Sequence, residues 1–570
     1  MSAAATLAGA APDLVPGWHS INWKKVWRNV RRLQARIVKA IQEGRWHKVQ
    51  ALVYLLTHSF SGRAAAILRV TTNSGASTPG VDGDGWDTPE LKAAAFSRLR
   101  RHGYCAQPLR RVYIPKSSDP SQRRPLGIPT MTDRAMQALY LLGLDPIVET
   151  TADASSYGFR NKRCCADALD HCHKILRNNH SATWILEGDI KSCFDRISQS
   201  WLLTHIPMDR VVLRQWLQAG FMEKDVFFAT TEGTPQGGIA SPALANATLD
   251  GLETLLQRRF GATRGQRTRN KVHLVRYADD FVITGTSKEF LRDEVQPLVA
   301  HFLKERGLEL SHEKTNITHI DDGFDFLGQN VRRYGTKLLL KPSRKNVRTF
   351  LAEIGDVIQH EGGHLTAGQL IERLNPKIHG WALYHRHASS AQTFARVDSE
   401  IWKKLWRWAR RRHSHKSAAW LKAKYFTRLG ESDWVFRGVV AGKEGSWHGV
   451  YLFRAHTLPI RRHVKVRGKA NPYDPAWELY FEERLATQMA DTLTGRVKAR
   501  YLWLGQDGKC LVCGQSLTLE AGWHVHHLLW RSHGGAGTVD NLVLLHPNCH
   551  RQVHSEGLVV NLAASREGRW

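Results

Sequence analysis

The sequence predicts a multidomain protein of mixed α and β structure, and three observations indicate this fold class. The chain has 570 residues, which is enough for three or four domains of ordinary size. Short β-rich runs alternate with helical runs over 109–341, which is typical of an α+β domain. Apolar residues then recur at helical spacing over 345–430, and cysteines and histidines gather after 505.

The N-terminal part is expected to be helical. Ser20 can cap a helix whose apolar residues recur at helical spacing up to Ile41. After Gly44 a second helical stretch runs to about residue 59, and 73–83 has the composition of a loop. Between 431 and 470 the sequence favours short strands.

The charge of the chain indicates a polyanionic partner. Its formal net charge is +29 and its pI is about 10.0. Cations in such excess repel one another unless a polyanion neutralises them, so we expect nucleic acid. An anionic membrane surface is the alternative, but the sequence shows no lipidation signal, no signal peptide and no long apolar run. The 8 cysteines are too sparse for a disulfide framework, and we expect a cytoplasmic protein without a membrane partner.

Two adjacent carboxylates form the most informative local pattern. Asp279 and Asp280 lie within the segment LVRYADDFVITG (274–285), where β-forming residues flank both acids. The pattern predicts a hairpin with the acids at its tip, where they would repel each other without a cation. A polar turn is the ordinary explanation of an isolated Asp-Asp pair. Only the neighbouring motifs decide against it.

Two further segments complete this constellation. WILEGDIKSCFDRI (184–197) runs as an apolar strand into Asp189, with Phe194 five residues further on. EGTPQGGIASP (232–242) lies between the two acidic segments, and its glycines permit a close approach of backbone to a ligand. Asp195 is more simply explained as a structural surface or cap residue.

In their order and spacing these segments resemble motifs A, B and C of reverse transcriptases. The resemblance implies a right-hand polymerase with fingers and palm over 93–342, which binds deoxynucleoside triphosphates. It implies that Phe194 excludes a 2′ hydroxyl and that Gln236 and Gly237 contact the incoming nucleotide. The residues implied to hold two Mg²⁺ ions are Asp189, Asp279 and Asp280.

Flanking segments resemble other parts of the same family. RVYIPK (111–116) and RRPLGIPT (123–130) resemble its fingers, which makes Lys116 and Arg124 candidates for gripping the triphosphate. LSHEKT (310–315) resembles motif D, with Lys314 as the candidate proton donor to pyrophosphate. A single Lys or Arg is ordinarily a solvated surface residue, and the motif context favours the functional interpretation here.

Segments outside the polymerase resemble group II intron-encoded reverse transcriptases of the bacterial, chloroplast-like group. TPGVDG (78–83) resembles their N-terminal extension, expected over 1–92, and LNPKIHGWALY (374–384) resembles their helical thumb. This thumb, also called maturase domain X, is expected over 343–430, with a DNA-binding region over 431–505.

The helix 401–413 interleaves cations with tryptophans, a combination that suits phosphates and unpaired bases. Leu405 and Trp408 are expected in the core. A solvated basic face is the alternative to RNA binding. The candidate RNA-binding residues are Lys403, Lys404, Arg407, Arg410 and Arg411.

The region 506–570 combines two metal-binding patterns. The first has the spacing C-x2-C followed by H-x2-C, which suits a structural Zn²⁺ in a domain too small for a large core. The residues of this first pattern are Cys510, Cys513, His546 and Cys549.

The remaining histidines resemble an HNH endonuclease, a small ββα-metal fold. The resemblance implies that His527 is the general base and that Asn541 pins the loop carrying it. His526, His550 and His554 would bind one divalent ion, such as Mg²⁺ or Mn²⁺. A structural zinc knuckle without cleavage is the alternative.

Together these resemblances imply an RNA-directed DNA polymerase that assists splicing of its intron RNA. With that RNA it would nick target DNA through the HNH domain and prime reverse transcription at the nick, a process called retrohoming. The alternatives are a splicing cofactor without polymerase activity and a domesticated reverse transcriptase serving repair or defence. The oligomeric state stays open, with a homodimer among the alternatives.

Overall fold

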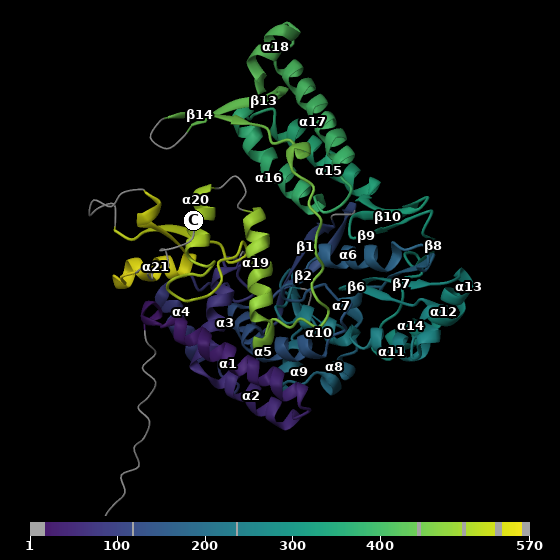
Figure 1. Ribbon diagram of the computed structural model, residues 1–570. Helices are drawn as coiled ribbons and strands as arrows, with labels where there is room; N and C mark the ends of the chain where they lie inside the picture. The colour runs from purple at the N-terminus through teal and green to yellow at the C-terminus, as the bar shows by residue number, and fades with distance from the viewer. Residues whose placement is uncertain are drawn as a thin grey trace, which may run out of the picture.

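The N-terminal region is a bundle of helices (Figure 1). Asn22 caps its first long helix by accepting a hydrogen bond from the Lys25 N–H, so the expectation that Ser20 caps this helix is wrong. Ser20 instead ends a short 3-10 turn. The elements are η1 (Trp18–Ser20), α1 (Trp23–Gln42), α2 (Trp46–His58), α3 (Phe60–Thr72) and α4 (Pro89–Arg98).

The structure is a computed structural model that describes residues 17–560 with six internal gaps. Those gaps are 74, 117–118, 235–236, 442–445, 493–496 and 530–537. Backbone alone is described at 116, 119–122, 486, 488, 490–492 and 497–498.

A four-stranded sheet of order β2-β1-β4-β5, here called the fingers sheet, follows the bundle. The strand β2 leads into α5 (Met131–Thr151), a helix that is buried over most of its length. The strands are β1 (Leu109–Lys116), β2 (Asp119–Ile128), β4 (Phe221–Glu223) and β5 (Val226–Phe228).

A second four-stranded sheet, here called the palm sheet, has the order β6-β7-β3-β8. Alternate residues of a strand face opposite sides, and both sides are covered here. Ile185 packs with α6 (Cys165–Leu176), whereas Leu186 packs with α10 (Ser241–Leu249). The strands are β3 (Trp184–Asp189), β6 (Leu274–Tyr277), β7 (Asp280–Gly285) and β8 (Asn316–His319).

Shorter helical elements connect these strands, and most of them contribute residues to the hydrophobic core, whereas α12 has no buried residue. They include a single π-helical turn before α14. These elements are α7 (Cys193–Arg196), α8 (Gln199–His205), α9 (Arg210–Gln218), α11 (Leu252–Phe260), α12 (Arg264–Asn270), α13 (Lys288–Phe290), η2 (Leu291–Val295) and α14 (Gln296–Lys304).

A three-stranded sheet leads from the palm into a helical layer that rises above it in Figure 1. The helical interpretation of 345–430 holds as far as Tyr425, where α18 ends. The elements are β9 (Phe324–Phe326), β10 (Gln329–Tyr334), β11 (Lys337–Pro342), α15 (Arg344–Asp356), η3 (Val357–Glu361), α16 (Ala367–His385), α17 (Ala391–Arg412) and α18 (Ala418–Tyr425).

The next three strands pack on these helices. Phe426 and Phe436 share one hydrophobic cluster with Leu374 and Leu405 of the helical layer. The expected domain boundary at 430 therefore falls inside a sheet that joins both sides of it. The strands are β12 (Phe426–Leu429), β13 (Ser432–Ala441) and β14 (Trp447–Tyr451).

The C-terminal part contains a two-stranded sheet followed by a helix, which is the ββα order expected of it. His524 pairs with Leu545 and His527 with Leu542 in antiparallel register. The elements after β14 are η5 (Ala455–Thr457), η6 (Pro475–Trp477), α19 (Glu478–Thr492), α20 (Val497–Gly505), β15 (His524–His527), η8 (Val539–Asn541), β16 (Leu542–Leu545) and α21 (Pro547–Glu556).

Within the described part of the chain, no single helix is long and apolar enough to cross a membrane. Helices α2 and α3, bent by 66°, meet the length and composition criteria only when they are taken together. Leu52 and Leu56 of α2 and Ile67 of α3 are buried in the hydrophobic core.

Candidate active site and metal centres

Three carboxylates meet where β3 ends and the β6–β7 hairpin turns. Asp189 lies opposite Asp280 in the register of β3 and β7, and Asp280 also pairs with Tyr277 across the hairpin. Asp279 occupies the turn beside Ala278, whose φ of 58° places the backbone in the left-handed region. The expected hairpin is confirmed. The pairing of β3 with β7 places Asp189, which comes from a separate segment, at the same edge of the sheet.

Close backbone packing holds the hairpin tip in place. A Cβ added to Gly158 would lie 2.3 Å from the Ala278 backbone nitrogen, so glycine is required there. The Gly158 carbonyl accepts a hydrogen bond of 2.8 Å from the Asn246 amide, and the Tyr157 N–H donates to the Arg276 carbonyl. The segment 156–160 is therefore a support of the tip.

A buried arginine, which the sequence patterns did not identify, braces the same tip. Arg276 is fully buried and forms an ion pair of 2.5 Å with Asp250. Its guanidinium also donates to the Asn246 amide oxygen and to the Ala278 carbonyl, at 3.1 and 3.4 Å. The sequence does carry a signal for this residue, because Arg276 interrupts an otherwise apolar strand. A charge at such a position is rarely buried unless it is paired, so the pattern indicates a buried ion pair.

The electrostatics of the cluster favour a bound cation. Burial and the neighbouring carboxylates of Asp279 and Asp189 raise the pKa of Asp280 to about 6. Burial and Asp189 raise the pKa of Asp279, while the cations of Arg124 and Lys314 oppose that rise. The Lys314 ammonium already lies 3.0 Å from an Asp189 carboxylate oxygen. These donors therefore suit divalent cations, which would relieve the repulsion among them.

The three acids share one edge of the sheet, but their carboxylate oxygens do not form one tight cluster. Among the described residues, Asp189, Asp279 and Asp280 form no group whose ligand atoms all lie within 4.8 Å of one another. Mutual repulsion, which raises the pKa of Asp280, opposes a closer approach.

Segments beside the acids are linked to one another by backbone contacts. The Thr234 N–H donates to the Phe194 carbonyl at 2.6 Å, which ties the glycine-rich loop to α7. Gly237 has a φ of 111°, and a Cβ there would lie 2.4 Å from the Gly127 carbonyl oxygen. The Phe194 ring meets the Phe159 ring edge to face, at 6.1 Å between centroids.

Two of the candidate nucleotide-binding residues cannot be placed in full. Gln236 lies outside the described residues, and only the backbone of Lys116 is described, at the end of β1. Arg124 pairs with Ile114 in the fingers sheet and is exposed. Its charge acts on Asp279, so the fingers sheet faces the acidic cluster.

The basic helix α17 separates its cations from its core. Leu405 and Trp408 are buried as expected, while Trp402 and Trp406 stack on each other with centroids 5.8 Å apart. Both stacked rings also meet Trp434 of β13 edge to face, so they pack within the protein. The candidate RNA-binding residues Lys403, Arg407, Arg410 and Arg411 are exposed and Lys404 is half-buried, and Arg396 and Arg412 of the same helix are exposed as well.

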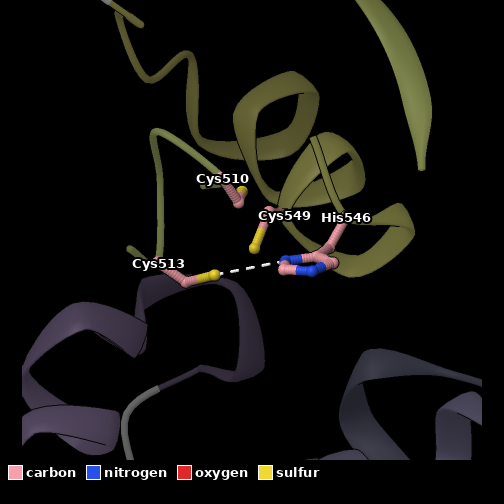
Figure 2. A group of neighbouring side chains, drawn as sticks. All are labelled: Cys510, Cys513, His546 and Cys549. Carbon is pink, nitrogen blue, oxygen red and sulfur yellow. Dashed lines mark hydrogen bonds between the residues drawn. The ribbon is translucent and has the colours of Figure 1, made fainter. Parts of the chain in front are cut away.

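The predicted zinc ligands come together as one buried group. Figure 2 shows Cys510, Cys513, His546 and Cys549 gathered at one point, and their ligand atoms all lie within 4.8 Å of one another. The Cys513 Sγ lies 3.3 Å from the His546 Nδ1. Hydrogen bonds from neighbouring thiols hold the pKa of Cys510 well below its ordinary value. The donor set suits tetrahedral Zn²⁺.

The three candidate nuclease ligands form a second group. The ligand atoms of His526, His550 and His554 lie within 4.8 Å of one another, and His550 Nε2 is 3.3 Å from His554 Nε2. Burial and the neighbouring His554 and His526 lower the pKa of His550 to about 4, so it is neutral and able to bind a metal. His526 is buried, and within the described part of the chain its Nδ1 has no hydrogen-bond partner. That unpaired buried nitrogen fits a ligand to a bound cation.

The candidate base and the residue expected to position it lie next to this group. His527 follows His526 on β15, so the two side chains point to opposite faces of the strand. The Asn541 amide accepts from the Leu529 N–H at 2.7 Å and donates to the Leu529 carbonyl at 3.0 Å. Asn541 thus holds the chain two residues after His527.

A third group of possible ligands is better explained as an ion-pair network. Cys164, Asp167 and His463 also lie within 4.8 Å of one another. However, Arg484 lies 2.7 Å from the buried Asp167 carboxylate and donates to it, which supplies the positive charge that a metal would otherwise bring.

Sequence models of known families match most of the chain. "Reverse transcriptase (RNA-dependent DNA polymerase)" matches residues 114–331, and "N-terminal domain of reverse transcriptase" matches 18–99. "Group II intron, maturase-specific domain" matches 347–426, and "HNH endonuclease" matches 510–556. The order of these domains agrees with the order expected from the motifs.

Individual proteins match about half of the chain. Protein YkfC of Escherichia coli is 32% identical over 352 residues, which cover 54% of this chain and 91% of that protein. The group II intron-encoded protein LtrA of Lactococcus lactis is 32% identical over 332 residues, which cover 46% of this chain and 54% of LtrA. The chain thus spans about half the length of LtrA.

One solved structure that matches part of the chain is a telomerase from Candida albicans in a complex with a fragment of telomeric RNA. The match covers 57% of this chain and 65% of the telomerase chain. Its sequence identity is 12% and its TM-score is 0.33, a score too low to carry an argument.

Proposed function

Because the chain belongs to the group II intron-encoded reverse transcriptases, we propose that it copies RNA into DNA at the palm carboxylates. It carries a reverse transcriptase domain and an HNH endonuclease domain, the domains of an RNA-directed DNA polymerase and a DNA endonuclease. The observation that carries the proposal is the meeting of Asp189, Asp279 and Asp280 at one edge of the palm sheet.

In the proposed polymerase site, different side chains bind the metal ions, the triphosphate and the leaving pyrophosphate. Asp189, Asp279 and Asp280 would hold two Mg²⁺ ions, which would activate the primer 3′ hydroxyl and stabilise the leaving pyrophosphate. Lys314, now 3.0 Å from Asp189, would turn to the triphosphate and protonate the pyrophosphate. Arg124 would bind the triphosphate from the fingers side, because its charge already reaches Asp279.

Substrate selection is proposed to depend on the residues around the acids. Phe194, fixed by the Thr234 hydrogen bond to its carbonyl, would exclude the 2′ hydroxyl of a ribonucleotide. Gln236 and Gly237 would contact the incoming nucleotide, and the left-handed backbone of Gly237 supports a close approach there. Lys116 would grip the triphosphate beside Arg124.

The proposed nuclease cuts DNA with His527 as the general base. His527 would take a proton from water, the hydroxide would attack the scissile phosphorus, and the 3′ oxygen would leave. Asn541 would hold the loop that carries this base. His526, His550 and His554 would hold the divalent ion, which would stabilise charge on the phosphate. The neighbouring Cys510 group would hold Zn²⁺ and keep this small domain folded.

We propose the biological role implied by these parts. Intron RNA would bind the basic face of α17, formed by Lys403, Lys404, Arg407, Arg410 and Arg411, and the protein would stabilise the splicing-competent RNA. The HNH domain would nick target DNA in the cytoplasm, where the segment up to 505 helps to hold that DNA. The new 3′ end would then prime copying of the intron.

Primer extension by the full chain on an RNA template tests the polymerase proposal. Synthesis by the wild type should disappear in Asp279→Asn, which keeps the size of the side chain but removes a metal ligand. Asp293→Asn is the matched control, because Asp293 is exposed and its one ion-pair partner among the described residues is the adjacent Arg292. If the wild type makes no product yet binds structured intron RNA, the chain acts as a splicing cofactor without polymerase activity.

A further inference from the structure

Helix α21 of the HNH domain presents side chains to three different surroundings. Residues four apart lie on one face of a helix, so each surrounding receives one pair of residues. The three pairs are Asn548 with Gln552, which contact the N-terminal segment, Cys549 with Val553, which lie in the core, and His550 with His554, which form the metal group.

The first pair joins the two ends of the chain. The Trp18 indole N–H donates to the Asn548 side-chain oxygen at 3.3 Å, between residues 530 positions apart. The Gln552 amide donates to the Ile21 carbonyl at 2.9 Å and also to the His19 carbonyl. Trp18 and Ile21 are 2% and 1% exposed, so this contact lies in a buried interface.

The interface extends beyond α21. Arg31 of α1 hydrogen bonds to Gln515 beside the cysteine group, and Lys509 forms an ion pair of 2.7 Å with Glu482 of α19. One continuous hydrophobic cluster includes Trp18 and also Val553. Figure 1 shows α21 beside α4, on the same side of the molecule as the N-terminal bundle.

The side-chain amide of Gln552 supplies hydrogen bonds that an apolar side chain of similar size could not make. Its amide nitrogen donates to two backbone carbonyls, whereas its buried Oε1 has no hydrogen-bond partner among the described residues. If the donor were removed, the Ile21 carbonyl would lose a buried hydrogen bond, which is costly, and the part-buried His19 carbonyl would lose its bond as well. Neither Asn548 nor Gln552 belongs to the metal groups of the domain.

We infer that the segment Trp18–Ser20 with Ile21 positions the nuclease. By holding Asn548 and Gln552 it fixes α21, and therefore His550 and His554, relative to the polymerase domain. A nick would then be made at a constant offset from the polymerase, and the same molecule would receive the new 3′ end. Asn548 and Gln552 are positioning residues in this scheme. The inference rests on the proposed nuclease function.

The test measures whether the molecule that makes a nick also extends it. Supercoiled plasmid is nicked by the full chain with Mn²⁺ and labelled deoxynucleotides, and excess competitor DNA captures any molecule that dissociates. The readout is the fraction of nicks that acquire label. In Gln552→Met this fraction should fall about tenfold or more, because extension no longer profits from intramolecular proximity.

Three comparisons make the result specific. Glu556→Gln, at the exposed end of the same helix, should behave as the wild type. Trp18→Phe keeps an aromatic ring but removes the indole donor. Its fraction of labelled nicks should therefore lie between that of the wild type and that of Gln552→Met. Plasmid nicked in advance should be extended equally by all variants, since capture of an existing nick needs no nuclease.

The possible failures are distinguishable. If Gln552→Met makes fewer nicks but extends the same fraction of them, α21 is only a structural element and the inference is wrong. If Gln552→Met makes as many nicks as the wild type and extends the same fraction of them, the contact does not position the nuclease. If the wild type itself makes no nicks, the proposed nuclease function fails and the inference falls with it.

Discussion

At the scale of single residues, Arg276 supports the palm most directly. It is fully buried against Asp250, and its guanidinium also reaches the Ala278 carbonyl at the hairpin tip. Arg276→Met would leave the Asp250 carboxylate buried without its partner. We expect a loss of about 3–5 kcal/mol in the free energy of unfolding, measured by urea denaturation of the full chain.

An exposed pair offers the control for this prediction. Arg292 and Asp293 contact each other at 2.7 Å, yet both side chains are 57% exposed. Arg292→Ala should leave the denaturation midpoint unchanged, because water screens such pairs. Replacing both buried partners, as Arg276→Met with Asp250→Leu, should recover part of the stability. Equal midpoints for Arg276→Met and the wild type would contradict the buried pair as a support.

One buried histidine, His385, and one half-buried histidine, His171, predict a dependence of stability on pH. Burial lowers the pKa of His171 and of His385 to about 3. The unfolded chain has a histidine pKa of about 6.5, so it binds more protons than the folded chain between these values. Stability from these groups is complete above about pH 6.5 and is lost as the pH falls toward 3.

His385 allows this prediction to be tested separately. Its ring lies between the Gln329 amide at 2.6 Å and the Asn346 amide oxygen at 2.9 Å, which links β10 to two thumb helices. His385→Gln cannot gain a proton, so its denaturation midpoint should fall less steeply between pH 7 and 5. His301→Gln is the control, because His301 is 73% exposed. An unchanged slope in His385→Gln would show that this ring is protonated in the folded chain.

At the scale of elements, the β6–β7 hairpin depends on one glycine outside it. A Cβ at position 158 would lie 2.3 Å from the Ala278 nitrogen and 2.9 Å from the Tyr277 carbonyl carbon. Gly158→Ala should therefore displace the turn that carries Asp279. We expect primer extension to fall by about a hundredfold or more, as small displacements of catalytic groups do, while plasmid nicking is retained.

A second glycine provides the matched control. Gly380 lies within α16, and a Cβ there would meet no described heavy atom within 4 Å outside the backbone of its own helix. Gly380→Ala should keep full primer extension and raise helix stability slightly, since alanine favours helices. If Gly158→Ala polymerises as well as Gly380→Ala does, the support from segment 156–160 is not required.

Sequence patterns reveal the elements whose cause is local. The hairpin at Asp279 and the helical face ending in Trp408 follow from residue periodicity, which short segments carry by themselves. The N-cap is harder to predict, because Ser20 and Asn22 are both good caps and only the packing of η1 decides between them. The strand content of 431–470 is also visible, but its packing against α16 depends on tertiary contacts.

Other features cannot be found in this way because they join distant segments. The contact of Gly158 with Ala278 and the bond of Trp18 to Asn548 each depend on the whole fold. The metal groups fall between these cases. Their spacing predicts Cys510, Cys513, His546 and Cys549 as one set of ligands, and the structure brings these four together. Spacing alone does not place His526 beside His550 and His554, a group that only the family resemblance implied.

At the scale of the whole molecule, the net charge of +29 should govern the affinity for RNA. Each phosphate neutralised by a cation releases counterions, so the logarithm of the dissociation constant rises with the logarithm of the salt concentration. In the proposed function, the exposed cations of α17 contact RNA phosphates directly. Their replacement should therefore change the slope of this plot as well as the affinity at one salt concentration.

The variant that tests this changes Lys403, Arg407, Arg410 and Arg411 to glutamine. The slope measured with a structured RNA transcript should decrease by about 0.7–0.9 for each phosphate that the helix no longer neutralises. The control variant changes the same number of exposed palm cations, Arg258, Arg259, Arg264 and Arg269, and keeps the net charge of the two variants equal. If both variants flatten the slope equally, the RNA responds to the total charge of the protein. If only the α17 variant does so, the phosphates lie on that helix, because a diffuse field would not distinguish the two faces.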